Sequence, residues 1–565
     1  MARRKSACRI ALPMPSDAET SPGQPLASRE GMARRVLQNL RPSHQHGPVA
    51  ATMLITAAQM LSRIVGFLRE KYIAWAFGAN NVTDAFYAAN TLPDYLYYIV
   101  AGGAASITFI TIYTRYLTEK REQEANRVFS TVLTVMVIVL GVLIVAGEVF
   151  APAIVATILP GFRRHPEQLQ LCVHLTRILV PMQLFFYVGG VVSAVLLSHR
   201  MFLVPALTPI LYTLGIIAGG VLLSRQFGIA SLAIGALAGA FVGPFLVNAM
   251  AASRTGIRYF PAFDLRNSGF REWVRLSIPL MLGVSLASAD EWIMRAFASA
   301  NLGAISHLNY AKRLFSVPYA VLGLSVGVAS MTFFARMFSE KRYAEFAARI
   351  NDSVYRAAAA SLLLSAWLWA AALPAVDLVF RGGKFHWQDS EETATYFAIF
   401  GLSLALWTAQ ALYARAFYAA RNTMLPMIAA TTITAASIPI FWAAFRTWDV
   451  MGLAIASDIG IAAQTIALAV LLDRRKLVPL GAMNWPGMSK AAAVALAAGV
   501  AGVAARTLWM RSGSRTADVI EIAIISLVWA AVCWIGLRLT GSDLLHSLRR
   551  RAAMPAVPAR SADQA

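Results

Sequence analysis

"SRIVGFLREKYIAWAFGANNVTDAF", residues 62–86, is a largely apolar stretch that carries arginine at Arg63 and Arg69 and aspartate at Asp84. A charge placed inside a membrane costs at least about 3 kcal/mol, so such residues usually face a bundle interior, a water-filled cavity or a charged partner. The stretch therefore predicts a membrane helix whose charged residues serve transport or pairing.

The composition of the whole chain is that of a membrane protein. The chain is 58% hydrophobic and 14% charged, with a mean hydropathy of +0.58, whereas soluble domains carry about 25% charged residues. Because basic loops hold topology against anionic headgroups, the net charge of +21 predicts membrane lipids rather than nucleic acid as partners. Cys8, Cys172 and Cys533 are far apart and indicate neither a disulfide framework nor a metal site.

Apolar segments predict the fold class. A spanning helix needs about 20 mostly apolar residues, and we expect an all-α polytopic membrane protein with about fourteen transmembrane helices. The segments are 50–68, 83–116, 127–158, 167–198, 202–224, 228–252, 272–301, 304–338, 351–380, 391–419, 423–446, 449–472, 488–510 and 518–540.

Loop charges predict the orientation of these spans. With the amino terminus inside, basic residues such as Lys120 and Arg121 concentrate in the cytoplasmic loops and are fewer in the opposite loops. An even number of spans returns the carboxyl terminus to the cytoplasm. The polar segment 1–49 lacks the apolar region of a signal peptide and is expected to be a disordered basic cytoplasmic tail. Residues 542–565 are expected to be a second cytoplasmic tail.

A repeated motif indicates two related halves. The stretch "GAASITF" at 103–109 returns as "GVASMTF" at 327–333, and a Tyr-Ala pair precedes each copy, at Tyr87 and Tyr310. An even number of spans separates the copies, so the halves share one orientation about an axis along the membrane normal. We expect two pseudo-symmetric six-helix lobes followed by two C-terminal helices. The expected bounds are 50–252 for the N-lobe, 253–472 for the C-lobe and 473–541 for the last two helices.

Four basic residues within spans are candidates for an anion site. Arg63 and Arg69 differ by about 120° around a straight helix, so both reach one cavity only if the helix bends near Gly66. Lys312 and Arg313 lie early in a span of the second half. Guanidinium groups bind phosphate through paired donors, so this set suits a pyrophosphate or another anion. The alternative is that Arg69 and Arg313 are anchors at the membrane interface.

Acidic residues within the spans are the second set of residues whose charge is costly to place in a membrane. Glu291 and Arg295 are spaced i and i+4, which suits an intrahelical ion pair. Alternatively, Asp290 and Glu291 form a sodium or proton site that couples transport to an ion gradient. Asp84 either caps a helix start or pairs with Arg69. The acids within spans are Asp84, Glu148, Asp290, Glu291, Asp377 and Asp458.

Soluble catalytic signatures such as GxxxxGK[ST] and HExxH do not occur in the chain. The loop "FRGGKFHWQDSEE" at 380–392 lacks a convincing metal-ligand spacing, and we expect a solvated connection there. The chain is therefore expected not to be an enzyme and to need no cofactor. Transport would be coupled to Na⁺, to H⁺ or to the membrane potential.

Several motifs resemble the MurJ/MviN family, the lipid II flippases within the MOP exporter superfamily. "SRIVGFLRE" at 62–70 resembles the family pattern SRxLGFxRD, and "FGANNVTDAFYAANTLP" at 77–93 resembles FGAGxxTDAFxxAFxxPN. "LPGF" at 159–162, "YAKRLFSVPYAVLGLSVG" at 310–327 and "GKF" at 383–385 follow the family in order. The likeness covers most of residues 53–420.

The resemblance implies a V-shaped pair of lobes around a cationic cavity that opens alternately to the two sides of a bacterial inner membrane. Arg63, Arg69 and Arg313 would hold the pyrophosphate of an undecaprenyl-pyrophosphate-linked lipid, and Asp84 would pair with a cavity arginine and help gating. The isoprenoid tail would lie in an apolar groove beside the last two helices. Cell-wall synthesis proteins are further partners that the resemblance suggests.

The chain departs from the family where "DYLYYIVAGGAA" at 94–105 replaces NLLRRxFAEGAF. Tyr97 and Tyr98 replace an arginine pair, and Gly102 replaces an acid. Tyrosine can donate a hydrogen bond to phosphate but adds no positive charge. We expect a flippase that moves lipid II to the outer leaflet in peptidoglycan biosynthesis. The alternatives are a flippase for another undecaprenyl-linked glycan of the O-antigen type and, less favoured, a cation-coupled drug antiporter.

Overall fold

The computed structural model describes residues 48–98, 104–287, 289–508, 514–542 and 544. Regular structure in these ranges is helical, with one isolated bridge between Gly382 and Phe385 and no β-strand. The fold class is therefore the all-α class that the sequence predicts. The tails expected at 1–49 and 542–565, and the departure at Gly102, lie almost entirely outside the described residues.

The helices are interrupted more often than the predicted spans. The first half contains α2 (Pro48–Phe77), α3 (Asn81–Ala89), α4 (Thr91–Leu96), α5 (Ala104–Thr118), α6 (Glu122–Ile158), the 3₁₀-helix η2 (Pro160–Arg164), α7 (Pro166–Leu179), α8 (Met182–Ser198), α9 (Leu203–Phe227), α10 (Ala230–Ala240), the π-helix η3 (Phe241–Val247), α11 (Asn248–Ala252) and the 3₁₀-helix η4 (Ser253–Thr255). The rest contains α12 (Ser268–Ala287), α13 (Ala289–Ala298), α14 (Ala304–Tyr319), the π-helix η5 (Ala320–Ser325), α15 (Val326–Ser339), α16 (Tyr343–Ala370), α17 (Ala372–Phe380), α18 (Trp387–Leu402), α19 (Leu404–Ala419), α20 (Met424–Arg474), the 3₁₀-helix η6 (Leu480–Ala482), α21 (Trp485–Thr507) and α22 (Arg515–Leu539).

The helix lengths are consistent with the predicted number of spans. Among the described residues, 7 helices are long and apolar enough to cross a membrane, or up to 9 if each of two bent pairs is one span. One of them, α20, has 51 residues and would be about 77 Å long, more than twice the bilayer core of about 30 Å. Trp448 and Asp449 have non-helical backbone angles inside α20, so they divide it into two spans.

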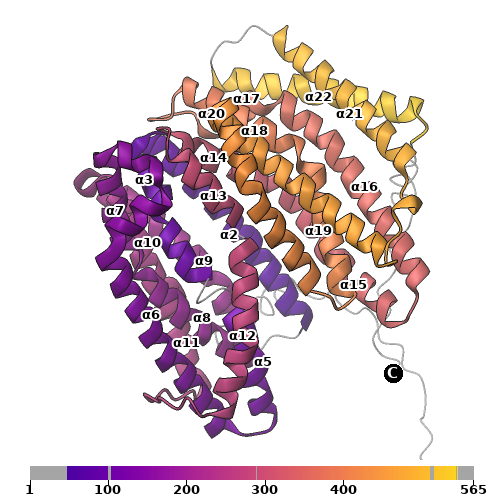
Figure 1. Ribbon diagram of the computed structural model, residues 1–565. Coiled ribbons are helices and arrows are strands. Elements are labelled where there is room, and N and C mark those ends of the chain that lie inside the picture. The colour runs from indigo at the N-terminus through magenta and orange to yellow at the C-terminus, as the bar shows by residue number, and fades with distance from the viewer. Residues whose placement is uncertain (1–47, 99–103, 288, 509–513, 543, 545–565) are drawn as a thin grey trace, which may run out of the picture.

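The helices form two groups that meet at one end of the molecule (Figure 1). Helices α3 to α11 make the first group and α14 to α20 the second, while α21 and α22 flank the outer side of the second group. One large hydrophobic core cluster joins the groups, since it contains Ile73 and Tyr87 together with Tyr310 and Phe441. Two other clusters belong mainly to one group each.

Equivalent turns reveal the internal repeat in the backbone. Lys120 and Lys341 have φ values of 58° and 59°, and Arg200 and Arg421 have φ values of 61° and 59°. The next residues also match: Arg121 bridges Glu119 and Glu124, just as Arg342 bridges Glu340 and Glu345. These matches lie at nearly the sequence offset of the repeated motif, so they support two halves of common design.

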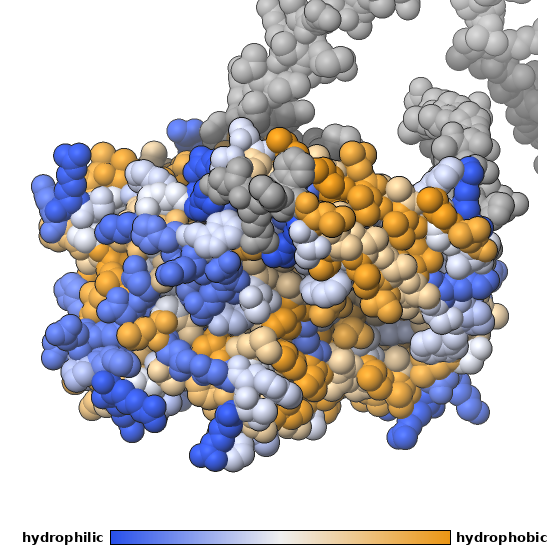
Figure 2. All heavy atoms as spheres, turned by 90° about the horizontal axis from the view of Figure 1, so that it is seen from above, coloured by the Kyte–Doolittle hydropathy of each residue, from blue (hydrophilic) through white to orange (hydrophobic). Residues whose placement is uncertain are grey.

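Contacts between the first group of helices and the helices from α13 onward gather at the end that the loop charges predict to lie outside the cytoplasm. The Gly161 amide donates to Ser299 Oγ at 3.0 Å, and the Lys384 amide donates to the Trp75 carbonyl at 2.9 Å. The Tyr87 and Tyr310 rings meet edge to face, with centroids 5.7 Å apart. Figure 2 shows the molecule from above, with hydrophobic side chains gathered toward the side of the second half. This end is therefore closed by direct packing. At the opposite end α12 of the second half packs against α5, where Arg115 pairs with Glu272 and Thr108 Oγ1 lies 2.7 Å from Ser277 Oγ.

Candidate functional site

A buried carboxylate, Glu70, lies at the centre of the first charge cluster. It is 1% exposed and pairs with the neighbouring Arg69. The Tyr87 hydroxyl donates to Glu70 Oε2 at 2.6 Å, and the Asn309 side chain donates to the same oxygen at 3.3 Å. Arg313 Nε lies 3.8 Å from Glu70 Oε1. The structure thus brings Arg69 and Arg313, from opposite halves, to one acid.

Sequence reasoning missed Glu70 because an Arg-Glu-Lys run reads as a membrane interface. The signal that could have found it is the acidic residue that ends the pattern SRxLGFxRD, which aligns with Glu70. The α2 helix continues without a break from Pro48 to Phe77, so Glu70 lies well inside it. A charge there needs partners, and these are the ones described above.

A second ion-pair cluster lies beside the first. Arg295 Nη1 donates to Asp94 Oδ2 at 2.9 Å, and Arg295 Nη2 lies 3.8 Å from Glu291 Oε2. Asp94 follows Pro93 in the first half, while Arg295 belongs to α13. The predicted pair between Glu291 and Arg295 is therefore present, but the shorter contact of Arg295 crosses to the first half.

Two adjoining cavities of about 170 and 230 Å³ connect these clusters. Both are lined by Arg295, Asn309 and Arg313. The charged residues that line them are Arg69, Arg295, Lys312, Arg313, Glu70, Asp94 and Glu291. Because basic and acidic groups nearly balance, the site is less cationic than the resemblance implies. Arg313 is the most exposed of the three arginines that line these cavities, since half of its side chain is exposed, against 19% for Arg69 and 15% for Arg295.

Asp84 has partners other than the expected arginine. It is fully buried, and its carboxylate accepts hydrogen bonds from the Gly303 amide at 2.6 Å and from the Ser306 amide and hydroxyl at 2.7 and 2.6 Å. These donors belong to the start of α14, so Asp84 caps a helix of the other half. The expected pair between Asp84 and Arg69 does not form, because Glu70 takes that place.

Asp290 already has a cationic partner. The Lys312 ammonium donates to Asp290 Oδ2 at 3.1 Å, and the Ser457 hydroxyl donates to the same oxygen at 3.2 Å. Lys312 also lies 5.7 Å from the centre of the Phe400 ring. A sodium or proton site at Asp290 and Glu291 would therefore compete with this lysine. No group of three or more potential metal-binding side chains occurs among the described residues.

Three other candidates lie away from the two cavities. Arg63 is exposed on α2 and lines neither cavity. Tyr97 and Tyr98 lie edge to face with centroids 5.5 Å apart, and Tyr98 lies 5.8 Å from Trp292 of α13. The structure thus gathers Arg69 and Arg313 but does not bring Arg63 or the two tyrosines to them.

The comparisons with known proteins agree with this fold. The family model described as "Lipid II flippase MurJ" matches residues 73–526. A "Probable lipid II flippase MurJ" of Buchnera aphidicola subsp. Acyrthosiphon pisum is 30% identical over 388 residues, covering 67% of this chain and 74% of the relative. The "Lipid II flippase MurJ" of Burkholderia cenocepacia is 28% identical over 387 residues, with the same shares covered.

Solved structures show the same architecture. A lipid II flippase MurJ in an inward closed conformation matches with a TM-score of 0.73 at 22% identity, covering 86% of this chain and 99% of that chain. An inward-facing multidrug resistance MATE transporter of the MOP superfamily matches with a TM-score of 0.59 at 13% identity, covering 76% and 98%. At such identities the likeness supports the fold, and the sequence matches support the family. This chain is a multi-pass membrane protein that belongs to the MurJ family.

Proposed function

We propose that this chain is a transporter, not an enzyme, that moves lipid II from the cytoplasmic to the outer leaflet of a bacterial inner membrane. The observation that carries the proposal is the meeting of Arg69 and Arg313 at Glu70, between the halves. The names of the relatives supply the substrate class. The neighbouring cavities offer room for a small anionic group, and a pyrophosphate is the anionic part of lipid II.

Arg313 is the residue that would receive the pyrophosphate first. Its 3.8 Å separation from Glu70 is longer than a hydrogen bond, so its donors are free to form the paired bonds that guanidinium makes with phosphate. Arg69 is more buried and pairs with the adjacent Glu70. Arg69 would therefore hold Glu70 in place, and join the anion when the halves rearrange.

The contacts between the halves suit alternating access. Asp84 caps α14 across the closed end, so opening that end requires the loss of charge-assisted hydrogen bonds. We assign this end to the outside and both chain termini to the cytoplasm. The N-lobe at 50–252, the C-lobe at 253–472 and the last helices at 473–541 would be the moving units.

Arg63, Tyr97 and Tyr98 would contact the substrate at a different stage of transport. Arg63 is exposed and precedes Arg69 by six residues, which corresponds to about 9 Å along α2. The tyrosines can donate hydrogen bonds where the family has arginines. The isoprenoid tail would lie along the last two helices. Another undecaprenyl-linked glycan remains the alternative substrate, because the missing arginine pair lowers the positive charge.

Growth rescue tests the proposal. A host whose essential lipid II flippase is depleted receives the wild type, Arg63→Ala, Arg313→Ala or Arg313→Lys, and Arg225→Ala as an exposed control. We expect rescue by the wild type and the control, loss with Arg63→Ala and Arg313→Ala, and partial rescue with Arg313→Lys, since lysine keeps charge without the paired donors. Failure of well-expressed wild type would point to another lipid-linked glycan. Rescue by Arg313→Ala would contradict the assigned role of Arg313.

A further inference from the structure

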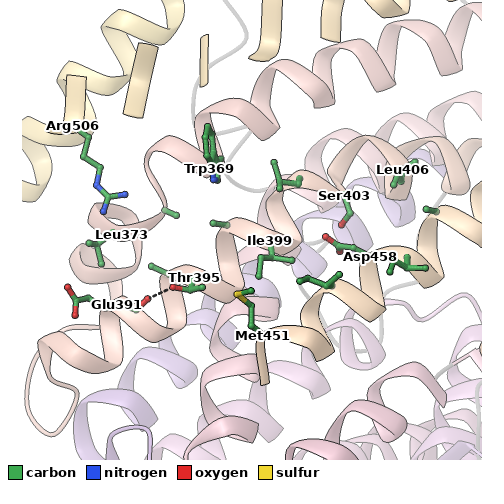
Figure 3. A pocket seen from close by; sticks show the side chains of 17 residues that line it. Trp369, Leu373, Glu391, Thr395, Ile399, Ser403, Leu406, Met451, Asp458 and Arg506 are labelled. Carbon is green, nitrogen blue, oxygen red and sulfur yellow. Dashed lines mark hydrogen bonds between the residues drawn. The ribbon is translucent and has the colours of Figure 1, made fainter. Parts of the chain in front are cut away.

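A separate cavity of about 830 Å³ lies within the second half (Figure 3). Its walls come from α16, α17, α18, α20 and α21, with Leu406 added by α19. Leu373, Ile399 and Met451 are among its apolar residues. The residues Glu70, Arg69 and Arg313 do not line it, so it is distinct from the central charge clusters.

The cavity opens toward the lipid-facing surface. Leu402 is 53% exposed and Ile459 is 42% exposed, and both line the cavity. Exposed large apolar side chains on a membrane protein contact acyl chains. A ligand that enters here therefore comes from the bilayer rather than from water, and it has a substantial apolar part.

The charged residues that line this cavity are two acids, Asp458 and Glu391, and one arginine, Arg506. Asp458 projects from α20 beside the Ser403 hydroxyl (Figure 3). The buried Asp458 Oδ1 has no hydrogen-bond partner among the described residues. The Ser403 hydroxyl, which donates to the Phe400 carbonyl at 2.9 Å, also interacts with the Asp458 carboxyl group, and the positive charge of Lys312 lies near enough to act on it. Arg506, the basic residue of the lining, lies 3.7 Å from Glu521. Glu391 adds a second acid at the rim.

We propose that this cavity binds a lipophilic monovalent cation, with its charge near Asp458 and its apolar groups against Leu373, Ile399 and Met451. Burial in an apolar wall makes an unpaired carboxylate costly, so a bound cation that pairs with the free oxygen of Asp458 would stabilise the charged form of this acid. The same acid disfavours an anionic amphiphile such as a polyprenyl phosphate. The selectivity of this site is thus opposite to that of the central arginines, and it does not depend on the identity of the transported lipid.

Two probes of nearly equal shape and opposite charge test the proposal. Equilibrium dialysis of the full chain in nanodiscs is done with tetraphenylphosphonium and with tetraphenylborate, and uptake by empty nanodiscs of the same lipid is subtracted, because the dipole potential of the bilayer favours the borate. We expect the phosphonium to bind and the borate to bind at least tenfold more weakly. Asp458→Asn keeps the shape of the side chain and should weaken phosphonium binding at least tenfold. Ala462→Trp should do the same by filling the cavity.

The control is Glu291→Gln, which removes an acid from the central cavities and should leave phosphonium binding unchanged. Phosphonium affinity that is equal for wild type and Asp458→Asn would overturn the proposal. So would tighter binding of the borate, absence of phosphonium binding to the wild type, or equal loss in Glu291→Gln. If Asp458→Asn fails to fold, Ala462→Trp takes its place: weaker phosphonium binding supports the proposal, and unchanged binding overturns it.

Discussion

Glu70 shows how a single acid organises the centre of this transporter. Its carboxylate accepts hydrogen bonds from three different residues and lies near Arg313. Arg69 of the first half and Arg313 of the second half thereby share one negative counter-charge. A residue that is unremarkable as part of an Arg-Glu-Lys run becomes the link between the two halves of the site.

Glu70→Gln is expected to destabilise the protein strongly. The substitution keeps the shape but removes the charge that balances Arg69, and loss of one partner of a buried ion pair costs roughly 3–5 kcal/mol. Tyr87→Phe removes one hydrogen bond to Glu70 and should cost only about 1 kcal/mol. The thermal unfolding midpoint in detergent, followed by tryptophan fluorescence, measures both. Equal midpoints for the two variants would show that the charge of Glu70 contributes little.

At the scale of elements, short turns bring the halves together at the closed end. A Cβ atom on Gly161 would lie 2.3 Å from backbone atoms of Ser299 and Ala300, whereas one on Gly66 would meet nothing within 4 Å. The turn between α6 and α7 therefore tolerates no side chain while this end is closed.

Arginine hydrogen bonds lower the pKa of Glu124 and Glu340 in the two equivalent turns of the opposite end.

Gly161→Ala is expected to open the closed end. The overlap should cost about 1–3 kcal/mol if the contact persists, so the population shifts toward states in which the halves separate. Spin labels are attached at the exposed positions Glu167 and Glu391 in a chain without its native cysteines. Pulsed electron paramagnetic resonance should show a longer distance between the two labels in Gly161→Ala than in the wild type. Gly66→Ala is the matched control and should leave the distances unchanged. Unchanged distances in Gly161→Ala would mean that the turn between α6 and α7 rearranges locally while this end stays closed.

At the scale of the whole molecule, orientation remains the main prediction. We expect Lys341 on the cytoplasmic side and Lys384 on the outer side, and both are exposed. Single cysteines at these positions, treated with an impermeant maleimide in intact spheroplasts, should react at 384 and react at 341 only after permeabilisation. The native Cys8, Cys172 and Cys533 are replaced by serine, because Cys8 of the tail expected in the cytoplasm would otherwise react after permeabilisation. The reverse labelling pattern would invert the proposed topology and the direction of transport.

Much of this architecture could be predicted from sequence, because apolar length and repeated motifs encode it directly. The span pattern, the repeat and the pair Glu291–Arg295 follow from local spacing. The partners of Asp84 and Asp290 could not be predicted, since Gly303, Ser306 and Lys312 reach these acids only through packing between distant helices. The same holds for Arg295, whose contact with Asp94 spans 201 residues of sequence. Charged residues within the spans identify candidate site residues, but the packing of the helices determines which of them come into contact.

The contact between Tyr87 and Tyr310 has a consequence for the origin of the chain. These tyrosines occupy equivalent places in the two halves, yet their rings touch each other. Contact between a residue and its own counterpart is the mark of an isologous interface, as in a twofold homodimer. An ancestral half-length protein would have paired through this tyrosine with a second copy of itself. Within the single chain the two tyrosines have different partners: one hydroxyl donates to Glu70 and the other to the Gly78 carbonyl.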